Sequence, residues 1–74
     1  MRDLAARFGA EELDADAIEA LAEAGVFDVF VVARTQLWDS RPPLRRNAAR
    51  YLAALARRGG PLDAATVILA TPAA

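Results

Sequence analysis

The clearest pattern of apolar and polar residues in the chain begins at Leu13. Asp14 has the position of a helix N-cap, and Leu13 and Ile18 have the spacing of a hydrophobic staple. Gly25 supplies a natural helix stop. We therefore expect a helix that begins after Asp14 and ends near Gly25. A shorter helical turn, stopped by a glycine, is expected at residues 2–8.

A second amphipathic helix is expected at residues 43–58. Pro42 and Pro43 interrupt the chain and then open this helix, because a first helical turn does not need the N–H that proline lacks. Gly59 and Gly60 mark its end. The residues of its apolar face are Leu44, Ala48, Tyr51, Leu52 and Leu55. We expect this face to be buried.

Residues 26–33 fit either a strand or a helix. Their β-branched and aromatic side chains favour a strand, whereas apolar residues in and just after the segment also recur at helical spacing. The residues that would share one helical face are Phe27, Phe30, Val31, Arg34, Leu37 and Trp38. Residues 65–71 have the same ambiguity, because a second staple-and-cap pattern around Asp63 favours a helix there.

Two folds are consistent with these patterns. The first is an all-α fold, a small bundle of three to four short helices with residues 39–43 as the turn of a helical hairpin. The second is an α/β fold in the order α-β-α-β, with two parallel strands at about 26–33 and 65–71 joined by a right-handed crossover. We favour the bundle, because an isolated pair of parallel strands leaves both faces of its sheet uncovered.

The composition changes this picture by suggesting a partner. We expect one domain, 1–74, and a domain of this size buries only about 60% of the surface that its unfolded chain exposes. The chain has no Cys and no His, so neither disulfides nor a Cys/His zinc site can add stability. It is nevertheless 55% hydrophobic, against about 45–50% in ordinary domains. A homo-oligomer or a protein partner would cover the excess.

Charge is divided unevenly along the chain. Residues 1–28 contain eight carboxylates and two Arg, a net charge of −6, whereas residues 29–74 contain seven Arg and two Asp, a net charge of +5. The arginines of the helix at 43–58 include Arg45, Arg46, Arg50 and Arg57. They could bind nucleic-acid phosphates, but we favour a solvated helix face or pairing with the acidic segment, because the isoelectric point is near 5.2 and nucleic-acid-binding domains are usually basic. The acidic residues that would pair are Glu12, Asp16, Glu19 and Glu23.

Trp38 and Arg41 lie together near the central turn. An aromatic residue beside an arginine can anchor an interface, although burial in the core is the commoner place for a tryptophan. Asp39 and Ser40 resemble the attachment site of phosphopantetheine carriers, but the prolines that follow depart from that motif. We expect Ser40 to initiate the turn or cap the next helix.

No enzymatic activity, cofactor or metal is expected. The chain has no His, Cys or Lys for acid–base or nucleophilic chemistry, and no glycine-rich phosphate loop. Its apolar runs, such as 29–33, are too short to span a membrane. The first eight residues lack the apolar core of a secretory signal, so a cytoplasmic location is expected.

The segment from Leu37 to Asp63 resembles the small delta subunit of NAD-dependent formate dehydrogenases. The shared features are the Trp38-Asp39 pair with Arg41, a basic helix, and Gly59-Gly60 followed by Leu62-Asp63. The resemblance covers about the last half of the chain, needs gaps, and is not taken as membership. It implies an accessory-subunit role.

The sequence thus predicts a non-enzymatic protein–protein interaction or accessory module, self-associating or bound to a larger partner through its charge-segregated helices, whose opposite charges could pair within one chain or between copies. A small regulatory nucleic-acid-binding protein that uses the helix at 43–58 is the alternative. The candidate interaction residues are Trp38, Arg41, Arg45, Arg46, Arg50 and Arg57.

Overall fold

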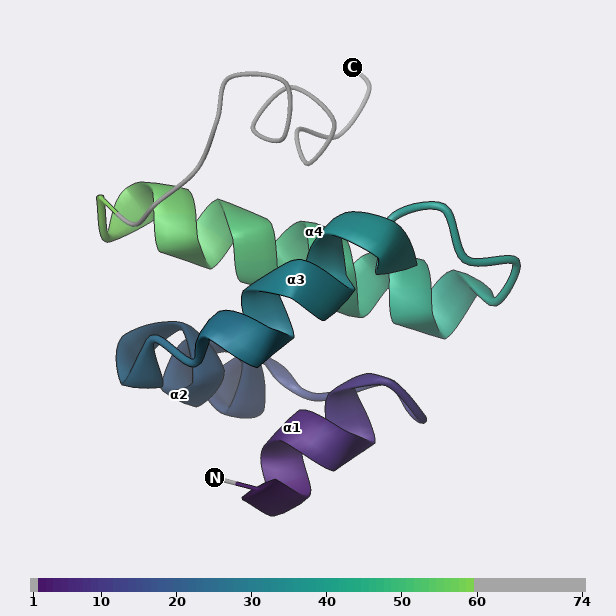
Figure 1. Cartoon of the computed structure of the whole chain (residues 1–74), viewed down its shortest axis with the longest axis horizontal. Helices are drawn as coiled ribbons and strands as arrows, with labels where there is room; N and C mark the ends of the chain where they lie inside the picture. The colour runs from purple at the N-terminus through teal and green to yellow at the C-terminus, as the bar shows by residue number, and fades with distance from the viewer. Residues whose placement is uncertain (1, 60–74) are drawn as a thin grey trace.

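The computed structural model describes residues 2–59 and shows a small bundle of helices without strands in that part of the chain. The helices are α1 (Arg2–Phe8), α2 (Ala15–Ala24), α3 (Phe27–Gln36) and α4 (Pro42–Arg57). In Figure 1, α4 passes behind α3, and α1 lies at the edge of the bundle opposite α4. The all-α prediction is confirmed.

The strand expected at 26–33 in the alternative fold is wrong, since these residues belong to the turn before α3 and to α3 itself. A helix gathers Val29, Ala33 and Gln36 on one buried face, whereas a strand would turn neighbouring side chains to opposite faces. The second expected strand, at 65–71, lies outside the described residues.

The ends of α2 follow the local sequence closely. The Asp14 carboxylate accepts a hydrogen bond of 2.8 Å from the backbone N–H of Ala17, and Leu13 and Ile18 are both buried. Gly25 ends the helix in the left-handed conformation, with φ of 65°, which suits a residue without a Cβ. The predicted cap, staple and stop are therefore confirmed.

The longest helix, α4, organises the core. It packs against both α2 and α3, and its apolar face is buried as predicted. Leu52 and Ala48 are fully buried, and the ring of Tyr51 meets Phe8 from α1 edge-to-face, with 5.4 Å between ring centroids. Such an aromatic pair adds to the stabilisation that comes from burial alone.

Two buried amides join α3 and α4 to the loop between α1 and α2. Asn47 on α4 accepts a hydrogen bond of 2.8 Å from Leu13 N–H and donates to the carbonyl oxygens of Phe8 (3.1 Å) and Glu11 (2.6 Å). Gln36 on α3 donates to the carbonyl oxygens of Phe8 (3.0 Å) and Leu44 (3.1 Å). The bonds to Phe8, Glu11 and Leu13 satisfy backbone groups at and after the end of α1 that lack a helical partner, and so they fix the path of the loop.

Candidate interaction surface

The outer face of α3 is apolar and exposed. We use the name outer stripe for Phe27, Val31 and Trp38, which are 70%, 47% and 71% exposed. Their spacing of i, i+4 and i+11 brings them to one side of a helix with 3.6 residues per turn. Val29 and Ala33, by contrast, are buried on the side that faces the core. The helix thus has apolar residues on two sides, and only one of them is covered by the rest of the described chain.

The helical path continues far enough beyond α3 to include Trp38. The N–H of Leu37 donates to the carbonyl of Ala33 (3.2 Å), and the N–H of Trp38 donates to the carbonyl of Thr35 (3.1 Å). The burial that we considered the commoner place for Trp38 is not found. Because an exposed tryptophan leaves a large apolar area in water, its position indicates a contact surface.

Charged groups border the outer stripe at both ends. Near the N-terminal end, Asp28 is exposed and forms no ion pair within residues 2–59. Toward the C-terminal end, the Arg34 guanidinium lies 6.0 Å from the centre of the Phe30 ring, within cation–π range. The rings of Phe27 and Phe30 are themselves 6.3 Å apart, so the aromatic and charged side chains form one continuous surface.

Asp39 and Arg41 form a tight local pair beside Trp38. The guanidinium of Arg41 donates two hydrogen bonds of 3.0 Å to the Asp39 carboxylate, and the backbone N–H of Arg41 donates a third of 2.8 Å. Hydrogen bonds from the Arg41 side chain and backbone lower the pKa of Asp39 from 3.8 to about 2. Arg45 adds a bond of 2.7 Å to the Asp39 carbonyl oxygen. These contacts hold the turn that presents Trp38.

The remaining arginines of α4 bind carboxylates of the acidic segment. Arg46 and Arg50 both contact Glu12, at 2.8 and 3.3 Å for the closest atom pairs, and this lowers the pKa of Glu12, chiefly through the hydrogen bond from Arg46. The Arg57 and Arg58 guanidinium groups share Glu19. The pairing expected between the two charged segments is confirmed at these two carboxylates.

The pairing does not extend to every expected carboxylate. Asp16 and Glu23 are exposed and form no ion pair in the part of the chain that the structure describes. Arg45 and Arg57 lie about 18 Å apart along α4 at 1.5 Å per residue. The six candidate residues therefore divide into a group around Trp38 and a separate row of arginines against the acidic segment. The sequence analysis placed Phe27 and Val31 on the same helical face as Trp38, but it included only Trp38 among the candidate interaction residues.

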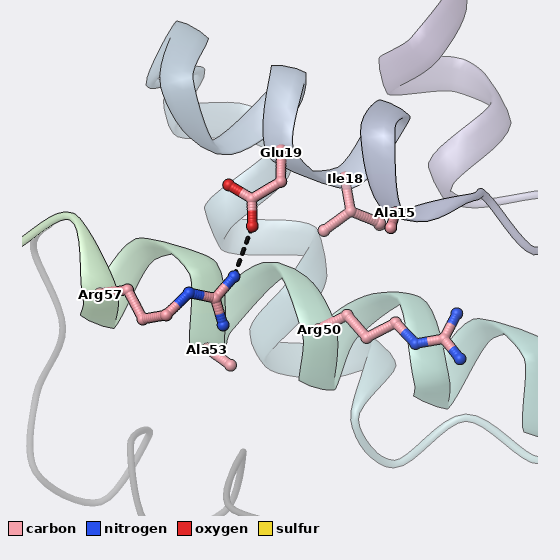
Figure 2. A pocket seen from close by; sticks show the side chains of 6 residues that line it. All are labelled: Ala15, Ile18, Glu19, Arg50, Ala53 and Arg57. Carbon is pink, nitrogen blue, oxygen red and sulfur yellow. Dashed lines mark hydrogen bonds and ion pairs between the residues drawn. The ribbon is translucent and has the colours of Figure 1, made fainter.

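A shallow hollow lies between α2 and α4. Figure 2 shows Arg57 reaching toward Glu19 across it, while Ile18 points from α2 toward α4 and Arg50 extends away along α4. Its volume is about 180 Å³, below the roughly 300 Å³ at which small-molecule pockets usually begin. The hollow has an apolar floor and an already formed ion pair at its edge, and it contains no pair of groups suited to catalysis.

Residues 2–59 contain neither a metal-binding cluster nor a membrane-spanning helix. No group of three or more side chains there is arranged to hold a metal ion. None of the helices that the structure describes is long and apolar enough to cross a membrane.

Comparisons with protein-family models, with curated proteins and with solved structures give no match to this chain. The resemblance of the second half of the chain to delta subunits of formate dehydrogenases gains no support from them. The accessory role that it implies, like the nucleic-acid alternative for the helix at 43–58, stays a prediction.

Proposed function

We propose that this chain is a non-enzymatic protein–protein interaction module that binds another protein subunit through the outer stripe of α3. The single observation that carries the proposal is the exposure of Phe27, Val31 and Trp38 on a side of α3 that no described element covers. Large aromatic side chains are enriched among the residues that dominate binding energy at protein interfaces.

The charge distribution also favours α3, and not the arginines of α4, as the surface for a partner. The charge segregation in the sequence suggested that oppositely charged helices could pair either within one chain or between copies. In the structure, Glu12 and Glu19 hold arginines of α4 within the same chain. Their pairing leaves the apolar side of α3 as the better candidate for contact with a partner.

Site-specific photo-crosslinking in cells that produce the full chain tests the proposal. A benzophenone amino acid at position 27 or 38 is expected to form covalent adducts with a protein partner. The same group at Ala56, on the exposed side of α4, is the matched control and is expected to form few. Val31→Asp should abolish the adducts at position 38, because a charge in the middle of an apolar contact is costly to desolvate.

Absence of adducts at both positions 27 and 38 would contradict the proposal. Adducts that persist unchanged in the Val31→Asp chain would contradict it as well, since they would arise from contacts independent of the outer stripe. Circular dichroism of each variant verifies that the helices are retained.

A further inference from the structure

We infer that the partner of the outer stripe is a basic amphipathic segment of another protein, whose arginine or lysine side chains lie along one flank of α3. This inference rests on the proposed function and names the chemistry of the occupant. We use the name acidic flank for Asp28, Val32, Thr35 and Asp39. The inference is supported by the place of this flank, the charge at Asp28, a hollow near Asp39 and the size of the stripe.

The acidic flank lies directly beside the outer stripe. Its residues follow the spacing i, i+4, i+7 and i+11, which brings them to one side of a helix with 3.6 residues per turn. The N–H of Asp39 donates to the carbonyl of Gln36 (3.1 Å), so the helical path extends this far. The hydroxyl of Thr35 donates to the carbonyl of Val31, and its oxygen is still able to accept a hydrogen bond. The flank therefore offers acceptors, whereas Arg34 lies on the opposite flank of the stripe.

Asp28 has a negative charge that nothing in the described part of the chain offsets. It forms no ion pair within residues 2–59, and residues 60–74 contain no basic residue. Glu23, in the last turn of α2 and four residues before Phe27, is a second exposed carboxylate without an ion pair among the described residues. A partner that covers Phe27 therefore meets negative charge. Nucleic-acid phosphates and anionic lipids are repelled there, whereas arginine and lysine are attracted.

A hollow at the other end of the acidic flank has room for one long side chain. It is lined by Val32, Thr35, Gln36 and Asp39, and its volume is about 240 Å³. This is below the roughly 300 Å³ at which small-molecule pockets usually begin. A lysine or arginine side chain can lay its hydrocarbon stem on an apolar residue such as Val32 while its charged end reaches a carboxylate.

The carboxylate at this hollow, Asp39, already binds Arg41 and can accept a second cationic group. Its Oδ2 atom accepts one hydrogen bond, of 3.0 Å from Arg41, and a carboxylate oxygen has two lone pairs. The chain already contains such sharing, because Glu12 binds both Arg46 and Arg50. Arg41 also keeps Asp39 ionised, since its hydrogen bonds lower the pKa of Asp39 to about 2.

The size of the outer stripe leaves a share of the interface to polar contacts. Phe and Trp side chains bury about 150–250 Å² each. With Phe27 and Trp38 about 70% exposed and Val31 and Val32 about half exposed, the apolar patch is on the order of 300–450 Å². A standard interface buries about 800 Å² per partner, of which about 57% is apolar. The patch accounts for the apolar share, and the acidic flank supplies polar groups for the remainder.

Fluorescence of Trp38, the only tryptophan in the chain, tests the inference on the purified full chain. The probes are two synthetic helical peptides without tryptophan. Both have leucine on one face, and the other face has lysine in one peptide and glutamate in the other. The lysine peptide is expected to shift the Trp38 emission to shorter wavelength and to bind at least about tenfold more tightly than the glutamate peptide. This preference should decrease as the salt concentration rises.

Charge reversal on the acidic flank separates local attraction from the effect of net charge. Asp28→Lys is expected to raise the dissociation constant of the lysine peptide about tenfold. Asp16→Lys is the matched control, because it makes the same change at the second residue of α2 instead of α3. It is expected to change the dissociation constant less than about twofold, since distant exposed charges are screened. Equal effects of the two variants would overturn the inference.

Thr35 permits a test in both directions, because its side chain is exposed and bonds only the helix's own backbone. Thr35→Glu is expected to tighten binding of the lysine peptide about threefold, and Thr35→Lys is expected to weaken it by a similar factor. Circular dichroism verifies that both variants retain their helices. A change in the same direction for both variants would contradict a flank that selects basic side chains.

The outcomes separate this inference from the proposed function. Equal binding of the two peptides, or no shift of Trp38 emission with either, would overturn the inference. A chain that doubles its mass in light scattering unless Val31→Asp is present would overturn it in favour of a second copy. A response of Trp38 to phosphatidylserine vesicles but not to the lysine peptide would overturn it in favour of a membrane surface.

The photo-crosslinks decide between failure of the inference alone and failure of both proposals. If crosslinks from positions 27 and 38 reach a protein segment without arginine or lysine, the inference is overturned and the proposed function stands with a partner of different chemistry. Crosslinks to a segment with basic residues at the acidic flank support both. Absence of crosslinks from both positions would overturn both.

Discussion

The two sides of α3 have similar side chains and opposite environments. Val29 on the inner side is 3% exposed, and Val31, two residues later, is 47% exposed. Each side also has a polar residue near the end of the helix: Gln36 is buried and bonded to two carbonyl oxygens, whereas Thr35 is exposed and bonds only the helix's own backbone. The difference shows that hydrophobicity alone does not decide which side becomes core and which remains available for a partner.

The largest expected effect comes from placing the same charge on each side. Val29→Asp is expected to destabilise the fold by about 3–5 kcal/mol, because it leaves an uncompensated charge in the core. Val31→Asp is expected to leave the stability of the isolated chain nearly unchanged, within about 0.5 kcal/mol. Urea unfolding followed by circular dichroism measures both. Both measurements are made at low protein concentration, so that association between chains does not contribute to the unfolding free energy. Equal losses would break the distinction between the sides.

A smaller loss of unfolding free energy is expected when the loop between α1 and α2 loses its hydrogen bonds to Asn47. Asn47→Ala removes three hydrogen bonds and leaves the buried N–H of Leu13 without a partner. Unsatisfied buried groups cost about 1–3 kcal/mol each, so we expect a loss of about 3 kcal/mol. Thermal unfolding measures the loss, and amide hydrogen exchange at Leu13 should accelerate. A variant as stable as the original would show that the loop does not depend on this amide.

The polar residues of the two sides offer a finer comparison. Gln36→Ala is expected to cost about 1–2 kcal/mol, because it removes two buried hydrogen bonds whose acceptors retain other partners. Thr35→Ala is expected to change the unfolding free energy by less than about 0.5 kcal/mol, since alanine is the better helix former and the lost bond is local. Chemical denaturation of the two variants side by side provides the measurement. A larger loss of unfolding free energy for Thr35→Ala than for Gln36→Ala would contradict the assignment of Gln36 to the buried side of α3 and of Thr35 to the exposed side.

The smallest effect expected is a dependence of stability on acidic pH that comes from carboxylates outside the core. Arginine contacts lower the pKa of Glu12 and of Glu19 below the usual 4.5 and that of Asp39 to about 2. These carboxylates bind fewer protons in the folded chain than in the unfolded one. Their contribution is therefore present above about pH 4.5 and is lost as the pH falls toward 2. Because the pairs are exposed, the effect should be small and should diminish with salt.

Unfolding curves measured from pH 2 to 6 at low and high salt test this expectation. Glu12→Gln should flatten the acid limb, because it removes one of the titrating groups. A stability that rises as the pH falls over this interval would contradict the sign. At alkaline pH the stability also depends on Tyr51, whose pKa is raised by burial. Its contribution is present below pH 10 and is lost at higher pH.

Local signals account for the parts of the fold that were predicted correctly. The cap at Asp14, the stop at Gly25 and the prolines that open α4 act through backbone groups within a few residues, so the sequence is sufficient to place them. The buried face of α4 follows from its helical period. The pairing of α4 arginines with Glu12 and Glu19 was expected from the opposite signs of the two segments.

The sequence was less informative about α3. The apolar face expected from spacing contains Phe27, Val31 and Trp38, and in the structure these three side chains are exposed. The side of α3 that enters the core is instead the one with Val29 and Ala33. Periodicity could not separate them, because apolar residues occur on every side of this helix. Asn47 was visible as a polar residue at the edge of an apolar face. Its partners are loop groups more than thirty residues earlier, and only folding brings them together.

By itself, the sequence determined where the helices cap and stop, which side of α4 is buried and which segments carry opposite charge, because each of these depends on neighbouring residues or on composition. The tertiary structure alone decided that residues 27–36 form a helix, that Gln36 and Asn47 hold the loop between α1 and α2, and that Trp38 faces outward. These three features depend on which surfaces of the other helices α4 covers. The packing of α4 against one side of α3 leaves the other side as the surface proposed for a partner.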